Sequence, residues 1–256
     1  EEHFETVGDA IRSYAGEKAQ GNDVVLTINS NIQRSAARAL EGKKGAVVVL
    51  DTATGAVLGE ASAPSYNSNN VESILTGSGS DGILVNRATQ TLYAPGSTFK
   101  IVTLAAALDT GTVTPSSVYN SPSSLEIGNA DITNYHNHAY GQTTVERAME
   151  VSSNTAFAQI ADELGADSLV SYSEKFGFNN KSLALDFDET TSLMPDPAEM
   201  TRWETAWAGI GQPVGEHKSP AGPQATPMQM AVCMAAIANN GVAVHPYVVD
   251  KIISAS

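Results

Sequence analysis

Hydrophobic residues occur in short runs separated by polar turns, and these runs predict the first elements of the fold. A strand is expected at 23–27, followed by an amphipathic helix at about 30–40. The apolar runs at 46–50 and 56–61 are joined by a short turn that ends in glycine, a spacing that predicts a β-hairpin. Residues 62–94 are rich in Ser, Asn and Gly and predict a long surface connection.

Helical patterns dominate the rest of the chain. A helix beginning at Ser97 is expected to stop at Gly111, and the next begins at a capping box of Thr143 and Glu146 and runs to about Val151. The further predicted helices are 155–164, 168–176 and one that opens with Thr226 and Pro227 and closes at Asn240 and Gly241. Because a hairpin precedes a series of helices, the pattern predicts an α+β fold with one main domain.

The most informative feature for function is a serine and a lysine one helical turn apart, Ser97 and Lys100. The run 101–108 has no polar face, so this helix is expected to be buried on nearly all sides. A lysine in a low-dielectric site tends to lose its proton, and a neutral amine beside a hydroxyl is a general base beside a nucleophile. Pro95 and Gly96 break the chain and leave Ser97 in the first helical turn, where unpaired N–H groups favour negative charge. The structural alternative is that Ser97 caps the helix and Lys100 extends to the surface.

A second candidate is Ser152-x-Asn154, which lies where two helical patterns meet. Both side chains can project from a tight connection there and offer a proton relay and a group that hydrogen-bonds substrate. The same spacing occurs at Ser65 and Asn67 in a polar loop, so the pattern alone does not identify a site. The alternative is that Ser152 and Asn154 cap a helix.

Composition and charge narrow the function classes. The formal net charge of -14 argues against nucleic-acid binding and against attraction to anionic lipid surfaces. The single cysteine, Cys233, lies in an apolar helical stretch and is expected in the core. His136 and His138 lie in a polar loop without acidic or cysteine ligands at zinc spacing, so no metal site is predicted. Trp203 and Trp207 are expected to share a helix face and pack in the core.

Together the two motifs resemble those of the penicillin-binding proteins and serine β-lactamases, whose sites combine Ser-x-x-Lys, Ser-x-Asn and Lys-Thr/Ser-Gly. The surrounding sequence is closer to the transpeptidase domain of class B penicillin-binding proteins. The resemblance covers roughly residues 23–250 in collinear order and is carried by the segments 26–29, 45–51, 86–88, 93–100, 148–157, 209–212 and 226–231. It implies a serine β-lactamase/transpeptidase-like fold, an antiparallel sheet flanked by helices.

This resemblance implies a role for each motif residue. Ser97 would be the acylated nucleophile, whose backbone N–H forms half of the oxyanion hole, and Lys100 the base that takes its proton. Ser152 would relay a proton to the leaving amine, and Asn154 would bind the amide of the donor peptide or the side chain of a β-lactam. The implied reaction is D,D-transpeptidation: attack on a D-Ala-D-Ala bond of a peptidoglycan stem peptide, release of D-Ala and transfer of the acyl group to an acceptor amine. β-Lactam antibiotics mimic the D-Ala-D-Ala end and leave a slow acyl-enzyme.

The same resemblance implies the cellular setting. The family needs no metal or organic cofactor, works with partner proteins of cell-wall synthesis, and acts at the extracytoplasmic face of the bacterial membrane, held by an N-terminal helix. No apolar stretch of this chain has membrane-spanning length and no signal peptide is evident, so the anchor is expected in an absent N-terminal region. Residues 1–22 are therefore predicted to be a linker, and residues 23–256 the transpeptidase domain.

The chain departs from the family pattern at the third motif. Lys-Thr/Ser-Gly is absent, and the nearest substitutes, Lys218-Ser219-Pro220 and Lys181-Ser182-Leu183, lack the glycine. Pro220 also excludes a central-strand position, because proline cannot donate to the ladder. The domain is thus expected to lack its C-terminal strands, to leave the hairpin without sheet partners, and to be inactive unless a longer chain or a second polypeptide supplies them. The segment 213–223 is longer than the family's usual connection and has no assigned function.

Two other functions would use the same residues. A serine β-lactamase or β-lactam sensor would share the site and differ in how long the acyl-enzyme lasts. A catalytically dead scaffold for cell-wall proteins would fold and bind partners without acylation. The segments 86–88 and 226–231 favour the transpeptidase over the β-lactamase, whereas the missing third motif favours the scaffold.

Overall fold

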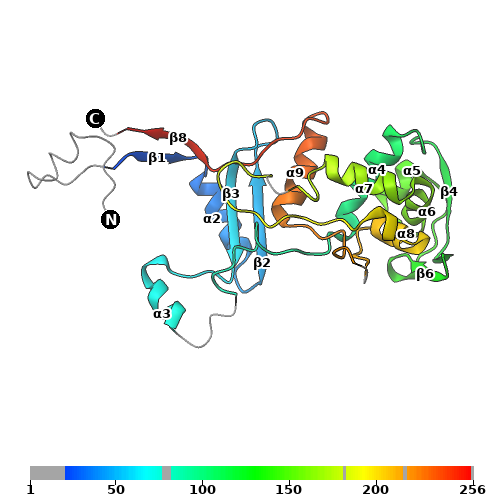
Figure 1. The fold of residues 1–256 in the computed structure, drawn as a ribbon, viewed down its shortest axis with the longest axis horizontal. Helices are drawn as coiled ribbons and strands as arrows, with labels where there is room; N and C mark the ends of the chain where they lie inside the picture. Colours follow the sequence, from blue (N-terminus) through cyan, green and yellow to red (C-terminus); the bar gives the residue numbers. More distant parts are fainter. Residues whose placement is uncertain (1–20, 77–81, 181–182, 216–217, 255–256) are drawn as a thin grey trace, which may run out of the picture.

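The computed structural model describes residues 21–76, 82–180, 183–215 and 218–254. The linker predicted at 1–22 lies, apart from residues 21 and 22, outside this range. The helices are α2 (Ser30–Ala39), α3 (Val71–Thr76), α4 (Lys100–Asp109), α5 (Val145–Glu150), α6 (Asn154–Leu164), α7 (Ala166–Lys175), α8 (Arg202–Gly209) and α9 (Pro227–Ala238) (Figure 1). The strands are β1 (Asp23–Leu26), β2 (Gly45–Leu50), β3 (Val57–Ala63), β4 (Val118–Ser121), β5 (Ser124–Ile127), β6 (Ala130–Thr133), β7 (Gly141–Thr144) and β8 (Val249–Ile253).

Within the described residues the strands form separate antiparallel pairs: β2 with β3, β1 with β8, β4 with β7, and β5 with β6. The β2–β3 pair is the hairpin predicted from the sequence, and its register places Gly45 opposite Ala63. This combination of helices with antiparallel strands confirms the α+β prediction.

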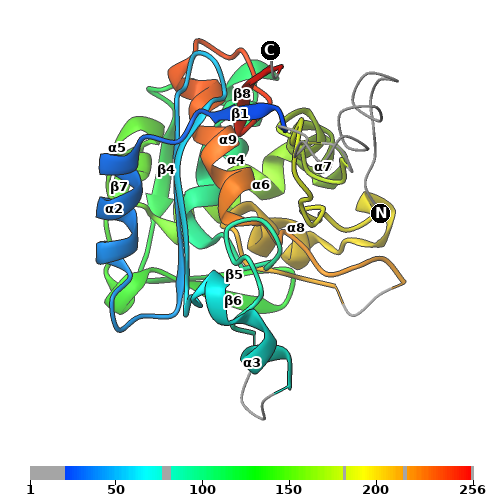
Figure 2. The same ribbon diagram turned by 90° about the vertical axis from the view of Figure 1, so that its left-hand side faces the viewer.

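The β2–β3 hairpin lies between two helices, with α2 against β3 on one face and α9 against β2 on the other (Figures 1 and 2). Alternate residues of β3 are buried, namely Val57, Gly59 and Ala61. Gly59 permits the close approach of α2, because a Cβ at this position would lie 2.8 Å from Cγ2 of Ile32. The hairpin thus forms the middle layer of a helix–strand–helix arrangement.

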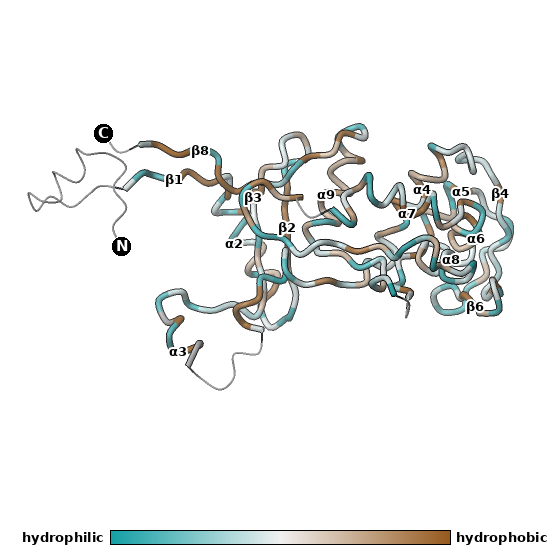
Figure 3. Tube along the Cα trace, in the orientation of Figure 1, coloured by the Kyte–Doolittle hydropathy of each residue, from teal (hydrophilic) through white to brown (hydrophobic). Residues whose placement is uncertain are grey.

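Strands β1 and β8 form a narrow ribbon that projects from the hairpin (Figure 1). Asp23 pairs with Ile253 in this ribbon. Thr27 anchors the ribbon at its base, because its hydroxyl donates to the carbonyl of Val57 at 2.6 Å. A two-stranded ribbon has no second layer to cover it, so hydrophobic residues such as Val24 and Ile252 stay exposed. Both strands of the ribbon carry hydrophobic stretches, coloured brown in Figure 3.

Helix α4 is the central element of the helical half and packs against α6 and α7. Its residues Lys100, Val102, Thr103, Ala106 and Ala107 are buried, as the absence of a polar face predicted.

Helix α6 also packs against α8 at a contact made by two small residues. A Cβ at Gly209 would lie 2.2 Å from the Cβ of Ala161, so only glycine permits this separation of the helices. On the same helix, Trp203 and Trp207 stack with ring centroids 5.6 Å apart and pack against the core as partly buried residues, which confirms their predicted role.

Two local predictions from the sequence are wrong. The cap of α5 is Thr144, whose side chain accepts from the backbone N–H of Arg147, while the predicted cap Thr143 is part of β7. The second error concerns 62–94, because 87–89 are buried rather than on the surface. Met228 at the start of α9 donates from its backbone to the carbonyl of Ala88, which ties this segment into the interior.

Candidate active site

The four site residues predicted from the sequence meet at the start of α4. Ser97 lies in the short 3₁₀ turn Gly96–Phe99 that leads into the helix. The side-chain nitrogen of Lys100, a residue with 0% exposure, lies 3.2 Å from Oγ of Ser97. The same nitrogen lies 3.0 Å from Oγ of Ser152 and 2.8 Å from Oδ1 of Asn154. Lys100 therefore does not extend to the surface, and that alternative is wrong.

The contacts of Lys100 fit a neutral amine. Its Nζ also lies 2.8 Å from the backbone carbonyl oxygen of Ser152. This carbonyl and the amide oxygen of Asn154 can only accept, so they take the two hydrogens of a neutral amine and leave its lone pair toward the hydroxyls of Ser97 and Ser152. Burial lowers the pKa of Lys100 to about 8. On the order of a tenth of the amine is then neutral at pH 7.

The turn between α5 and α6 carries Ser152 and Asn154 to the lysine. Ser152 has a left-handed backbone with φ of 54°, which is uncommon for a residue other than glycine. Ser153 between them is buried and caps α6, because its Oγ accepts from the backbone N–H of Ala156 at 3.1 Å. The capping role predicted as an alternative for Ser152 and Asn154 thus belongs to Ser153.

Asn134, which the sequence analysis did not single out, holds this turn in place. Its side chain is 3% exposed, and its Oδ1 accepts from the backbone N–H groups of Asn154 at 2.7 Å and Thr155 at 3.1 Å. Its Nδ2 donates to the carbonyl of His138 at 3.0 Å. A buried amide that satisfies backbone groups of two segments fixes their relative position. The contact with Asn154 spans 20 residues of sequence, so no local spacing reveals it.

Two glycines set the turn that presents Ser97. The backbone N–H of Gly96 donates to the carbonyl of Gly211 at 2.9 Å. Gly211 has φ of 81°, and a Cβ there would lie 1.9 Å from the carbonyl oxygen of Gly96. Glycine at 211 is therefore required both by its backbone conformation and by the close approach of the chain that precedes the nucleophile.

Ser97 and Ser152 line two adjoining cavities. The first, of about 580 Å³, is mostly polar and extends from the two serines past Asn154 to the loop Tyr135–Asn137. The second, of about 540 Å³, is mostly apolar and is walled by methionines of α5 and α9, including Met149 and Met230. The two hydroxyls are thus accessible from both sides, while the base between them is buried.

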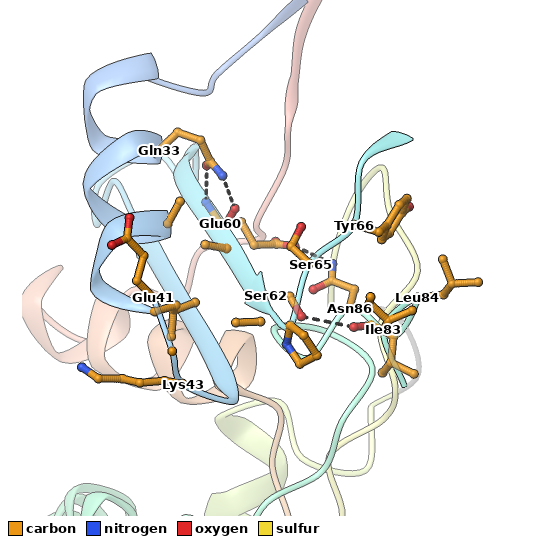
Figure 4. Close-up of a pocket in the computed structure, with 17 residues that line it drawn as sticks. Gln33, Glu41, Lys43, Glu60, Ser62, Ser65, Tyr66, Ile83, Leu84 and Asn86 are labelled. Atoms are coloured by element: carbon orange, nitrogen blue, oxygen red, sulfur yellow. Dashed lines mark hydrogen bonds between the residues drawn. The ribbon is translucent and has the colours of Figure 1, made fainter. Parts of the chain in front are cut away.

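A separate cavity of about 650 Å³ lies between α2 and the end of β3 and does not include the four site residues (Figure 4). Gln33 holds its inner wall, donating from Nε2 to the carbonyl of Glu60 and accepting from the backbone N–H of Glu60 at 2.8 Å. Burial raises the pKa of the Glu60 carboxyl, although the hydrogen bond from Asn86 opposes this. Among the described residues that line this cavity no serine hydroxyl is hydrogen-bonded to a basic side chain, so it is not the candidate active site.

The remaining candidate residues from the sequence are not shown to be part of the active site. Cys233 is fully buried, and burial raises the pKa of its thiol to about 12, which fits the predicted core role. Ser219 accepts a hydrogen bond from the backbone of Asp196, and neither Ser219 nor Lys218 lines the cavities beside Ser97. The other third-motif substitute includes residues 181 and 182, which lie outside the described range. Across the described ranges no three His, Cys, Asp or Glu side chains could hold a metal ion together.

The site combines a serine hydrogen-bonded to a buried lysine with a Ser-x-Asn turn, on an α+β fold. This combination defines the class of proteins that includes the penicillin-binding proteins and the serine β-lactamases. Comparison with known proteins narrows this class. The model of the penicillin binding protein transpeptidase domain matches residues 45–255, and the chain belongs to this family. This confirms the family that the sequence motifs indicated.

Relatives and solved structures agree with this assignment. The chain is 32% identical to the peptidoglycan D,D-transpeptidase PbpA of Mycobacterium tuberculosis over 93% of its own length and 50% of that protein. It is 29% identical to the peptidoglycan D,D-transpeptidase MrdA of Escherichia coli over 89% of its length and 37% of that protein. The chain therefore spans half or less of these two relatives.

Among solved structures, the D,D-transpeptidase domain of a peptidoglycan glycosyltransferase from Eggerthella lenta superposes with a TM-score of 0.88 at 44% identity, covering 96% of this chain and 64% of that one. Penicillin-binding protein A from M. tuberculosis, solved as a penicillin G acyl-enzyme complex, superposes with a TM-score of 0.83 at 28% identity and covers 96% of this chain and 59% of that one. The fold is thus that of the transpeptidase domains. None of the helices within the described residues is long and apolar enough to cross a membrane.

Proposed function

We propose that the protein is a D,D-transpeptidase that cross-links peptidoglycan stem peptides through an acyl-enzyme on Ser97. The observation that carries this proposal is the cluster in which one buried amine, that of Lys100, contacts the hydroxyls of Ser97 and Ser152. The D,D-transpeptidase names of the relatives MrdA and PbpA, and the β-lactam acyl-enzyme structures of penicillin-binding protein A, support it.

In the first half-reaction, neutral Lys100 takes the hydroxyl proton of Ser97 as Oγ attacks the carbonyl carbon of the D-Ala-D-Ala bond. The new C–O bond forms a tetrahedral intermediate. Collapse breaks the C–N bond, and the departing amine takes a proton from the hydroxyl of Ser152. Lys100, now an ammonium 3.0 Å from that hydroxyl, returns the proton to Ser152 and is neutral again. D-Ala leaves and the acyl group stays on Ser97.

In the second half-reaction an acceptor amine attacks the ester carbonyl. The amine loses its proton to Ser152 as Ser152 passes its own hydroxyl proton to Lys100. The C–O bond to Ser97 then breaks, and Lys100 delivers that proton to Oγ of Ser97. The products are a new amide and free enzyme. A β-lactam passes through the first half-reaction only, because its opened ring stays attached and blocks the acceptor.

Asn154 is suited to hold the donor peptide. Its Oδ1 accepts from Lys100, and one hydrogen of its Nδ2 is donated to the carbonyl of Thr133 at 2.9 Å. The second hydrogen of Nδ2 is available to a peptide carbonyl of the donor. The side chain thus links the base to the bound substrate.

The proposed setting follows from the family. The protein acts at the extracytoplasmic face of the bacterial membrane on peptidoglycan, together with other cell-wall synthesis proteins. No metal or organic cofactor takes part in the proposed steps, since Lys100 supplies the base and Ser152 the proton relay.

Intact-mass spectrometry after incubation with a labelled penicillin tests the proposal. We expect a mass increase of one β-lactam in the natural chain and none in Ser97→Ala. Ser65→Ala, at another Ser-x-Asn spacing, serves as the matched control and should be acylated like the natural chain. A natural chain that folds but takes up no label, and that gains none when it is extended through a Lys-Thr-Gly strand, would contradict the proposal and favour the scaffold. A label that turns over within minutes would favour a β-lactamase.

A further inference from the structure

The outer wall of the polar cavity is a short loop with an unusual backbone. The loop Tyr135–Asn137 joins β6 to β7 and lines the same cavity as Ser97 and Ser152. His136 and Asn137 both have left-handed backbones, with φ of 51° and 53°. Such conformations persist in residues other than glycine when the surroundings hold them, and they often mark functional loops.

The side chain of Asn134 fixes the loop to the turn between α5 and α6, which carries Ser152 and Asn154. Asn134 precedes the loop directly, and its buried amide accepts from the backbone of Asn154 while donating to the carbonyl of His138 beyond the loop. The two ends of the loop are therefore tied to the turn that carries the proton relay. The loop is therefore a wall of the cavity held in place by hydrogen bonds, rather than an independent surface segment.

The side chains of this wall are suited to a peptide. The rings of Tyr135 and His136 lie with centroids 4.0 Å apart, and Tyr135 is 78% exposed. The imidazole and the amide of Asn137 can each donate and accept a hydrogen bond, as peptide groups require. The apolar cavity on the other side of the serines, with its methionine wall, offers a peptide fewer such partners.

The proton path of the reaction indicates where the acceptor binds, because attack by an amine is the reverse of its departure. Ser152 gives a proton to the departing amine, so the incoming amine must pass its proton back to Ser152 from the same position. The acceptor peptide attached to that amine has to extend from Ser152 into a cavity that adjoins it. The polar cavity leads from Ser152 to the loop Tyr135–Asn137.

We propose that the loop Tyr135–Asn137 is the acceptor-binding wall and that His136 determines which amine-bearing peptides are accepted. This inference rests on the proposed function and deepens it. In the transfer step the ester bond to Ser97 breaks, the amide bond to the acceptor forms, and the amine proton passes through Ser152 and Lys100 to Ser97. His136 acts on binding and orientation of the acceptor and takes no proton in this scheme.

The test compares two histidines of the same connection. His136→Asn keeps a residue that tolerates the left-handed backbone, and His138→Asn is the matched control, because His138 packs against Tyr140 and does not line the polar cavity. Each variant is acylated with a thioester analogue of the D-Ala-D-Ala donor and offered the tripeptide L-Ala-γ-D-Glu-L-Lys. The ratio of amide product to hydrolysed donor is then measured.

We expect the ratio of transfer to hydrolysis to fall about fivefold in His136→Asn, because the shorter asparagine side chain does not reach as far into the cavity as the imidazole and loses one hydrogen bond to the acceptor. The ratio should fall by less than twofold in His138→Asn. Both products arise from one acyl-enzyme, so the ratio is independent of the acylation rate. An unchanged ratio in His136→Asn, or an equal fall in both variants, would overturn the inference.

Failure of the proposed function would look different, because the natural chain would then form no acyl-enzyme. In that case tripeptide binding is followed by the NMR shifts of the two imidazoles. A shift confined to His136 supports the wall as a peptide site even without the reaction. Shifts in neither histidine reject it.

Discussion

The amide oxygen of Asn134 lies 2.7 Å from the backbone nitrogen of Asn154, and this bond joins the β6–β7 connection to the first residue of α6. The same oxygen accepts from Thr155 at 3.1 Å. One buried amide therefore supports two N–H groups at the start of the helix that carries a site residue. Removal of this amide would leave both N–H groups without their acceptor, one of them in the buried backbone of Thr155.

Asn134→Ala should for this reason lower the free energy of unfolding by about 1–3 kcal/mol. It should also slow penicillin acylation at least tenfold, because Asn154 loses its fixed position beside Lys100. Urea denaturation and the acylation rate measure the two effects. The control is Asn120→Ala, an exposed asparagine of β4. Equal effects in the two variants would show that Asn134 has no special role.

Acylation should depend on pH through Lys100. The buried amine has a pKa lowered to about 8, so the reactive neutral form grows with pH up to that value. We expect the acylation rate to rise about tenfold per pH unit below pH 8 and to level above it. A rate that does not change between pH 6 and pH 8 would exclude Lys100 as the base.

Lys100→Arg provides a second test of the same base. A guanidinium keeps its proton at every accessible pH and cannot take one from Ser97. Acylation should fall by about 10² or more. Lys175→Arg, on the exposed end of α7, is the control and should be acylated at the natural rate.

Two glycines with nearly the same φ allow the effect of a left-handed backbone to be measured separately from the effect of a close contact. Gly211 and Gly241 have φ of 81° and 83°, but a Cβ would strike Gly96 from position 211 and meets nothing within 4 Å at position 241. Gly241→Ala should cost about 1–2 kcal/mol of stability, the strain of a left-handed alanine. Gly211→Ala should cost clearly more and also slow acylation, because the turn before Ser97 must move. Similar denaturation midpoints and acylation rates in both variants would contradict this reasoning.

Glu189 should make the fold less stable as the pH rises. Burial raises its pKa to about 7, an effect that the nearby charge of Glu60 increases and the hydrogen bond from Thr226 opposes. Its Oε2 is buried without a hydrogen-bond partner among the described residues. The folded state thus holds this proton more tightly than the unfolded state. The resulting stabilisation is complete below about pH 4.5 and is lost as the pH rises through 7.

Denaturation at pH 5 and pH 8 measures this effect. The loss attributable to Glu189 is on the order of 3 kcal/mol. Glu189→Gln should show a smaller difference between the two pH values than the natural chain. Glu126→Gln, an exposed glutamate of β5, should show the natural difference. The idea fails if Glu189→Gln retains the full pH dependence.

The sequence was sufficient for those parts of the site that depend on local spacing. Ser97 and Lys100 are one turn apart on a helix with no polar face, so both the contact and the burial of the amine could be predicted. Ser152 and Asn154 interrupt a helical pattern, which located the turn. Asn134 could not be predicted, because its role arises from a tertiary contact with a segment 20 residues away.

The fold shows the same limit. The hairpin of β2 and β3 was predictable from two apolar runs and a glycine turn. Strands β4 to β7 were not, because each has four residues and buries one or two of them, so no apolar run marks them. The cap of α5 was displaced by one residue because two adjacent threonines, Thr143 and Thr144, can each serve, and strand pairing with β4 takes in both. Residues 87–89 are likewise buried by tertiary contacts, although the polar sequence around them predicts a surface position.

The ribbon of β1 and β8 has a mechanical consequence. Its outer residues, Asp23 and Ile253, are paired directly, so the chain enters and leaves the described body at one point. Tension between those two positions would separate the antiparallel strands one pair at a time, from the tip inward. The β2–β3 hairpin and the contacts of Lys100 with Ser97 and Ser152 would carry no load until the ribbon had fully opened. The ribbon therefore protects the active site from tension applied to the two ends of the described chain.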